Sequence, residues 1–210
     1  MCRWSASCSD PVPEAVSLLA RASTAAPHSI ERELLVAAAF CEAALDGGVL
    51  VGGAAADLYT GSYRPTDIDL VGHWQDGYQE RLAVLGFTSS GRHWLIGFSD
   101  GETLAVEVPA DRLFELAAES PDVIDLDPGR LAVITIDDLM MDRLLAATEG
   151  EPVTFEEAVR LAVAAHASIS WAKLEDRSRD AAATGTLAGG ILPTVLRRVR
   201  RAAVRALRDK

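Results

Sequence analysis

The 210-residue chain has little that would tie it to a membrane, an oxidising compartment or a nucleic-acid coat. No apolar run reaches the roughly 18 residues needed to span a bilayer, and the first residues lack the apolar segment of a secretory signal. Its three cysteines (Cys2, Cys8 and Cys41) are an odd set, which favours reduced thiols over a disulfide framework. The formal charge of −11 argues against a uniformly basic coat protein. We therefore expect a cytoplasmic protein without membrane association.

The common glycine and metal fingerprints are missing as well. Gly52-Gly53 is not continued into G-x-G-x-x-G, and the chain has no Gly-Lys-Ser/Thr of a P-loop. An EF-hand starting at Asp67 fails, because Val71 and Tyr78 stand where an oxygen ligand and a glutamate are required. None of the histidines has zinc-site spacing, so we interpret them as surface or packing residues. They are His28, His73, His93 and His166.

The elements that are present alternate in the middle of the chain and are helical at both ends. Apolar periodicity and capping residues predict helices over 11–26 and 29–45, with Ser29 as the second N-cap. A strand at 49–51, a short helix at 54–59, a strand at 67–71 and a helix at 74–86 follow. Alternating runs at 93–98 and 103–108, joined by Ser99-Asp100-Gly101, predict a β-hairpin.

The second half of the chain is predicted to be mainly helical. Residues 111–120 are helix-like, and an apolar run follows at 131–136. Helices are then expected over 139–148, capped by Asp137-Asp138, over 154–166, capped by Thr154, and over 168–183. A basic terminal helix is expected after Gly189-Gly190 and Pro193. The fold class is therefore α/β (α+β), a small mixed sheet with flanking helices. We divide it into an extension with the first helix (1–28), an α/β core (29–136) and a C-terminal helical domain (137–210).

Two carboxylates close together are the main chemical signal. Asp67 and Asp69 stand two apart on a predicted strand, so they point to the same face. Adjacent carboxylates repel each other and lose hydration unless a cation lies between them. A hard divalent cation satisfies this need, and its usual partner is a phosphate. Glu107 is a lone acid in the otherwise apolar second strand of the hairpin, with Glu102 as the other acid nearby.

These residues resemble the nucleotidyltransferase superfamily of DNA polymerase β, in its small bacterial branch of uncharacterised and abortive-infection toxin-type members. The local form G-G-x-A-x-x-L-Y-x-G-x-x-R-x-T-x-D-I-D-L is nearly complete from Gly52 to Leu70. It departs at one point, because Thr66 directly abuts Asp67. The segment from Ile136 to Ala146 also resembles the D-L-x-x-x-(Lys/Arg)-L-x-A helix of that group.

The resemblance implies Mg²⁺-dependent transfer of a nucleoside monophosphate from an NTP to a hydroxyl on an RNA end, a protein side chain or a small molecule. Asp67, Asp69 and Glu107 would hold one or two Mg²⁺ ions and act in catalysis. The NTP would be contacted by other residues of the two motifs. These are Gly52, Gly53, Arg64, Thr66 and Arg143. A toxin role with an antitoxin partner is a further implication, and a catalytically silent nucleotide- or partner-binding member is the alternative.

The last fourteen residues are basic in an otherwise acidic chain. Residues 197–210 carry six arginines and Lys210 against Asp209, a local charge of +6 that leaves −17 for the rest. The arginines alternate with apolar residues such as Val195, Val199 and Leu207. Two interpretations follow: contact with the phosphates of tRNA or another RNA, or an amphipathic helix docked on the acidic body.

Overall fold

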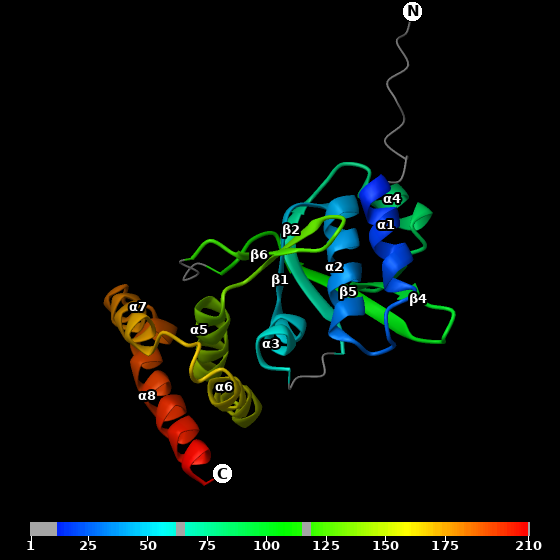
Figure 1. The fold of residues 1–210 in the computed structure, drawn as a ribbon. Coiled ribbons are helices and arrows are strands. Elements are labelled where there is room, and N and C mark those ends of the chain that lie inside the picture. Colours follow the sequence, from blue (N-terminus) through cyan, green and yellow to red (C-terminus); the bar gives the residue numbers. More distant parts are fainter. Residues whose placement is uncertain (1–11, 62–65, 115–118, 210) are drawn as a thin grey trace, which may run out of the picture. The chain divides into compact units, whose positions relative to one another are not determined.

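A mixed sheet with flanking helices forms the first of two units in the computed structural model, and a group of helices forms the second (Figure 1). The structure describes residues 12–61, 66–114 and 119–209. Within these ranges the first unit takes residues 12–58, 66–113 and 121–133, and the second takes 59–61, 114, 119–120 and 134–209.

Seven strands of the described chain form one sheet in the order β3-β4-β5-β2-β1-β7-β6. The central strand β2 pairs antiparallel with β1 and parallel with β5, and β1 pairs parallel with β7, so the sheet is mixed. The predicted hairpin is confirmed as the antiparallel pair β4–β5. The bounds are β1 Leu45–Val51, β2 Ile68–Trp74, β3 Thr88–Ser90, β4 His93–Gly97, β5 Thr103–Ala110, β6 Asp122–Asp125 and β7 Arg130–Val133.

Helix α2 (Ile30–Ala44) is the main helix packed on this sheet, where it contacts β1, β2 and β7. Its predicted cap is confirmed, because the Ser29 hydroxyl accepts a hydrogen bond from the Arg32 backbone N–H. Phe40 is fully buried and packs edge-on against Phe87, with ring centroids 5.4 Å apart. The other helices of this unit are α1 (Pro13–Ala22), α3 (Gly52–Thr60, whose last two residues belong to the second unit) and α4 (Tyr78–Val84). Helix α4 is shorter than predicted.

A buried arginine joins the start of α2 to the tip of the β4–β5 hairpin. The Arg32 side chain is 1% exposed, and its guanidinium pairs with Asp100 at 2.7 Å and with Glu102 at 2.5 Å. It also donates to the backbone oxygen of Ala22 at 3.0 Å and lies 4.6 Å from the centre of the Phe98 ring. This arrangement satisfies a charge that would otherwise be costly to bury.

Glu33, next to this arginine, is half-buried, and its ionisation makes the stability of the fold depend on pH. Burial, with the neighbouring charges of Asp57 and Glu102, raises the pKa of Glu33 to about 7. The folded state then holds a proton that the unfolded chain loses near pH 4.3, so Glu33 lowers stability as pH rises between these values. Replacing Glu33→Gln should raise the melting temperature at about pH 8 and change it little at about pH 4. The exposed Glu31→Gln is the control, and an equal gain at both pH values would contradict the account.

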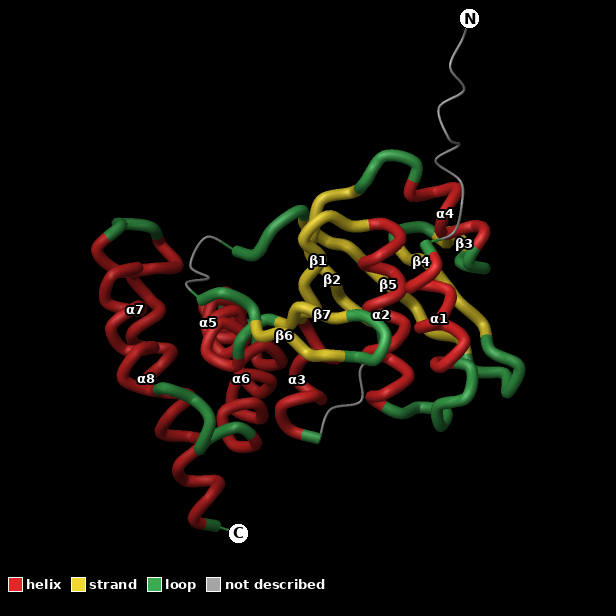
Figure 2. The backbone as a smooth tube through the Cα atoms, turned by 45° about the horizontal axis from the view of Figure 1, so that its top comes forward, coloured by secondary structure: helices red, strands yellow, loops and turns green. Residues whose placement is uncertain are grey.

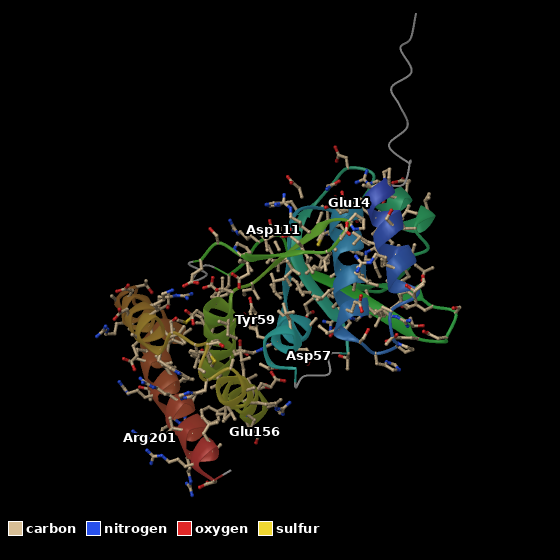
Figure 3. The ribbon with its side chains drawn as sticks, viewed as in Figure 1. Glu14, Asp57, Tyr59, Asp111, Glu156 and Arg201 are labelled. Carbon is tan, nitrogen blue, oxygen red and sulfur yellow. The ribbon has the colours of Figure 1, made fainter. Side chains whose placement is uncertain are left out.

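The second unit contains four α-helices among its described residues, which appear as helical tubes without strands in Figure 2. They are α5 (Ile136–Ala146), α6 (Pro152–Ala164), α7 (Trp171–Ala183) and α8 (Leu187–Arg208), with a short 3₁₀ turn at Ala147–Glu149. The end of α3 also belongs here, where the Tyr59 hydroxyl donates to the backbone oxygen of Ile134 at 2.8 Å (Figure 3).

Several predicted helix starts are wrong by a few residues. Helix α5 is capped by Thr135, while Asp137 and Asp138 are buried in its first turn. They serve instead as anchors: Asp137 accepts from the Ser170 N–H at 2.7 Å, and Asp138 pairs with Arg177. Both buried carboxylates thus have partners outside α5, as buried polar groups require.

Two other helices begin before their predicted starts. Helix α6 starts at Pro152, a residue suited to the first helical position, and not after Thr154. Helix α8 contains Gly189, Gly190 and Pro193, which were expected to precede it, because its Thr186 cap lies further upstream. The predicted helix at 111–120 does not form at residues 111–114 or 119–120, and residues 115–118 lie outside the described residues. Of the helices described, none has the length and apolar character to cross a bilayer.

Candidate functional site

Three polar side chains line up across neighbouring strands of the sheet. Asp69 on β2 is the register partner of Glu107 on the parallel strand β5, and Glu107 is the register partner of His93 on β4. Directly paired residues on adjacent strands point to the same face, and the strands are about 4.8 Å apart. The alternate positions Ile68 and Val106 are buried on the opposite face. The sheet therefore presents a row of one carboxylate, a second carboxylate and an imidazole.

Asp67 joins this row from the residue before β2. It lies one position outside the strand on which it was predicted. The His93 Nε2 atom is 3.8 Å from the Asp67 Oδ2 atom and 3.4 Å from the Glu107 Oε2 atom. One ligand atom from each of these three residues lies within 4.8 Å of the other two. The predicted third carboxylate is thus beside the Asp67–Asp69 pair.

The carboxylates differ in exposure and in their polar neighbours. The Glu107 side chain is only 11% exposed, whereas those of Asp67 and His93 are about one-third exposed. Arg92 places its Nε atom 3.2 Å from Glu107, from a side chain that is 72% exposed. Thr66 is exposed, and its hydroxyl donates to Asp67 at 3.2 Å. The site is open on the side of Asp67 and Arg92 and closed at Glu107.

Gly52 brings the backbone directly against Asp69. Gly52 follows Val51, the register partner of Asp69 on β1, and it is the first residue of α3. A Cβ atom at Gly52 would lie 2.0 Å from the Asp69 Oδ2 atom, and the residue has a φ of +64°, which favours glycine. The start of α3, with its partly positive N–H groups, is therefore next to the carboxylates.

This close approach predicts a large effect of one added methyl group. Replacing Gly52→Ala should displace the Asp69 carboxylate, and any reaction that depends on this carboxylate should slow by at least ~10²-fold, because a misplacement of about 1 Å has effects of that size. Gly47→Ala is the matched control, since Gly47 has a φ of +67° and nothing within 4 Å of an added Cβ. Both variants carry about 1–2 kcal/mol of backbone strain, so an equal loss of activity in both would contradict a specific role for the Gly52 contact.

Two of the other predicted nucleotide contacts lie beside this row: Gly53 follows Gly52 at the start of α3, and Thr66 is next to Asp67. Arg64 lies outside the described residues. Arg143 lies on α5 in the second unit, where its guanidinium is 3.8 Å from Asp142, so its contact with a triphosphate stays a prediction. Glu102, the alternative third acid, instead pairs with Arg32 away from this row.

His93 and Arg92 are the neighbours of the site that sequence reasoning missed. The signal for His93 was present, because a turn over Ser99-Asp100-Gly101 that pairs Gly97 with Thr103 also pairs His93 with Glu107. Arg92 carries no such signal, since it lies in the tight connection between β3 and β4.

The donor atoms of this row suit a divalent cation. Carboxylate oxygens are the usual protein ligands of Mg²⁺ and Mn²⁺, and imidazole nitrogen is accepted by Mn²⁺ and later transition ions. Ligand atoms of Asp67, Glu107 and His93 lie close enough together to share one ion, and Asp69 is beside them as the register partner of Glu107. The residues therefore fit a divalent metal ion.

Comparison with known proteins gives distant likenesses only. No family model matches the sequence, and no curated protein matches it. Among solved structures, an antigenic nucleotidyltransferase-like protein from Paracoccidioides brasiliensis is similar over 58% of this chain and 67% of its own, at 15% identity and a TM-score of 0.44. The antibiotic-resistance factor ANT(2'')-Ia is similar over 91% of this chain and 95% of its own, at 18% identity and a TM-score of 0.34. Both TM-scores lie below 0.5, so these likenesses assign no activity to this chain.

Proposed function

We propose that this protein is a metal-dependent nucleotidyltransferase that moves a nucleoside monophosphate from an NTP to a hydroxyl group. The observation that carries the proposal is the register pairing of Asp69 with Glu107, which places the isolated strand acid beside the Asp67–Asp69 pair. A sheet built for stability alone gains nothing from carboxylates in adjacent register positions. These two acids are 38 residues apart in sequence, and only the pairing of β2 with β5 brings them to neighbouring positions on one face. We interpret this arrangement as functional.

In this proposal each residue near the row has a distinct task. Asp67, Asp69 and Glu107 would hold the cation, and Glu107 would also accept the proton of the attacking hydroxyl. When bound, a divalent cation would neutralise the triphosphate and anchor the attacking and leaving oxygens. The N–H groups at the start of α3, Gly52 and Gly53, would contact phosphate oxygens. Arg92, exposed and next to Glu107, is placed to turn toward the triphosphate.

The position of the label in the NTP tests this proposal directly. The full chain is incubated with each NTP labelled at the α- or the γ-phosphate, with Mg²⁺ or Mn²⁺, and with total RNA or a protein mixture as acceptor. Nucleotidyl transfer moves the α-label to the acceptor and releases the γ-label as pyrophosphate. Transfer of the γ-label would indicate a kinase, and no transfer or pyrophosphate release with any NTP would favour the silent alternative.

RNA is the acceptor class that we propose, because of the surface of α8. Its apolar residues Val195, Val199 and Ala203 are buried within the second unit, while the arginines between them are exposed. Five arginines of α8 line a groove of about 710 Å³ that also contains two acids, Glu175 and Asp209, and Figure 3 labels one of the arginines, Arg201. They are Arg197, Arg200, Arg201, Arg205 and Arg208. The helix is therefore both docked by its apolar face and basic on its exposed face, so the two interpretations from the sequence are compatible.

The salt dependence of RNA binding measures the contribution of this basic face. Arg201 and Arg205 are one helical turn apart and have no acidic partner among the described residues, whereas Arg200 pairs with Glu175. Arg201→Gln with Arg205→Gln should weaken RNA binding and reduce the slope of log K against log salt by about 1.4, or about 0.7 for each lost contact with a single strand. Arg179→Gln, an exposed arginine of α7, should leave the slope unchanged. An unchanged slope in the double variant would rule out this face.

The toxin role and the antitoxin partner remain predictions of the sequence resemblance. The base preference of the enzyme is the next quantity that the labelled NTPs would define.

A further inference from the structure

The imidazole of His93 lies between two carboxylates that belong to the candidate metal site. Its Nε2 atom is 3.4 Å from Glu107 and 3.8 Å from Asp67, and its side chain is 30% exposed. Both distances are longer than a charge-assisted hydrogen bond, which is about 2.7–2.9 Å. Hydrogen bonding to the two carboxylates therefore does not account for the position of the imidazole.

The same two distances suit a shared ion. Two atoms that each lie about 2.1 Å from one metal ion can be at most about 4.2 Å apart. Both His93 separations are below this limit, and the same nitrogen atom, Nε2, makes both approaches. His93 is also held in place by its register pairing with Glu107 at the start of β4, so little ordering is required when an ion binds.

We propose that His93 is a metal ligand together with Asp67 and Glu107, and that the site consequently prefers Mn²⁺ to Mg²⁺. Mg²⁺ favours oxygen ligands and keeps several of its waters, so an imidazole contributes little to its binding. Mn²⁺ also accepts carboxylates but binds imidazole nitrogen more readily, as do the ions that follow it in the transition series. This inference rests on the proposed function for the location of the site, and it adds the identity of the ion and of a nitrogen ligand.

Electron paramagnetic resonance of bound Mn²⁺ tests the ligand without any catalytic assay. The full chain is titrated with Mn²⁺ to obtain its affinity, and electron spin echo modulation of the bound ion then reports directly coordinated ¹⁴N. Wild type should show nitrogen coupling from one imidazole. His93→Gln should lose it and bind Mn²⁺ at least ~10-fold more weakly, since even residues that only orient a ligand change affinity by ~10–100-fold.

Competition between Mg²⁺ and Mn²⁺ measures the preference of the site for Mn²⁺. Mg²⁺ should displace Mn²⁺ from wild type only at a large excess, and the excess needed should fall by about the same factor as the Mn²⁺ affinity in His93→Gln. His73→Gln is the matched control, because His73 lies on β2 at the far end of the strand from Asp69 and its Nδ1 atom is 3.9 Å from Asp111. Glu107→Gln should weaken Mn²⁺ binding, which locates the ion.

The results separate this inference from the proposed function. Mn²⁺ bound without nitrogen coupling, or coupling that persists in His93→Gln, would overturn the role of His93 even if nucleotide transfer is observed. Equal affinities for Mg²⁺ and Mn²⁺ would overturn the preference. Nitrogen coupling that depends on His93, in a protein that transfers nothing from any NTP, would support this inference and contradict the proposed function.

Discussion

Replacing Asp69→Asn is expected to lower nucleotidyl transfer by at least ~10³-fold, because the charge stabilisation supplied at a metal site is several kcal/mol and each 1.36 kcal/mol is tenfold in rate. The variant keeps the shape of the side chain and removes its charge. Its register partner Glu107 then has one fewer negative neighbour, so the free energy of unfolding should be unchanged or slightly higher. Transfer rates and urea unfolding, measured on the same preparations, give the two quantities.

Asp46→Asn is the matched control for this change. Asp46 is an exposed aspartate on the neighbouring strand β1, opposite His73 and away from the row. We expect full activity in this variant. An Asp69→Asn protein that transfers nucleotide at the wild-type rate would remove Asp69 from the site, and one that unfolds would show that the pair has a structural role instead.

Replacing Arg32→Met is expected to have the largest effect on stability, about 3–5 kcal/mol. The change removes the guanidinium but keeps an apolar chain beside Phe98. Glu102, whose side chain is 5% exposed, then loses its cation, and the backbone oxygen of Ala22 loses its donor. Glu102 keeps the His28 backbone N–H and imidazole as neighbours, but it loses the arginine charge that compensates its burial, and this accounts for most of the expected loss. Urea or thermal unfolding at neutral pH measures it.

An exposed arginine of the same unit provides the comparison. Arg112 lies just after β5 and is exposed, so Arg112→Met should change the free energy of unfolding by less than about 0.5 kcal/mol. A similar small change in Arg32→Met would show that the buried cluster is not important for stability. Adding Glu102→Gln to Arg32→Met should recover part of the loss, since it removes the buried negative charge that the arginine compensated.

Local signals in the sequence predicted much of the fold, and they failed where a distant contact decides the structure. The Ser29 cap and the β4–β5 hairpin follow from residues close together in the chain, so both were predicted. The start of α8 was placed too late because Gly189, Gly190 and Pro193 are helix breakers in isolation. Packing of α8 against α5, α6 and α7 outweighs their low propensity. The role of Asp138 was missed for the same reason, because its partner Arg177 is 39 residues away.

In the candidate site, too, local sequence patterns predicted some residues, and contacts between distant strands determined the positions of others. Asp67 and Asp69 are two residues apart in sequence, and their alternation on a strand predicted a shared face. The position of Glu107 depended on the pairing of β5 with β2, a parallel contact whose existence no local pattern indicates. The hairpin register, counted outward from its turn, pairs His93 with Glu107, so the position of His93 beside Glu107 was predictable from the sequence. The sequence thus predicted the acids, and the topology of the sheet brought them together with the imidazole.

The central claim is that Asp67, Asp69 and Glu107 form one metal–nucleotide site. Its most direct test is a crystal structure of the protein with Mn²⁺ and an NTP analogue that cannot be cleaved between its α- and β-phosphates, using the anomalous signal of the ion. The account predicts an anomalous peak within about 2.1–2.3 Å of oxygens from Asp67 and Glu107, bridging to the triphosphate. A nucleotide bound elsewhere, or full occupancy of the nucleotide with no ion at these carboxylates, would contradict it.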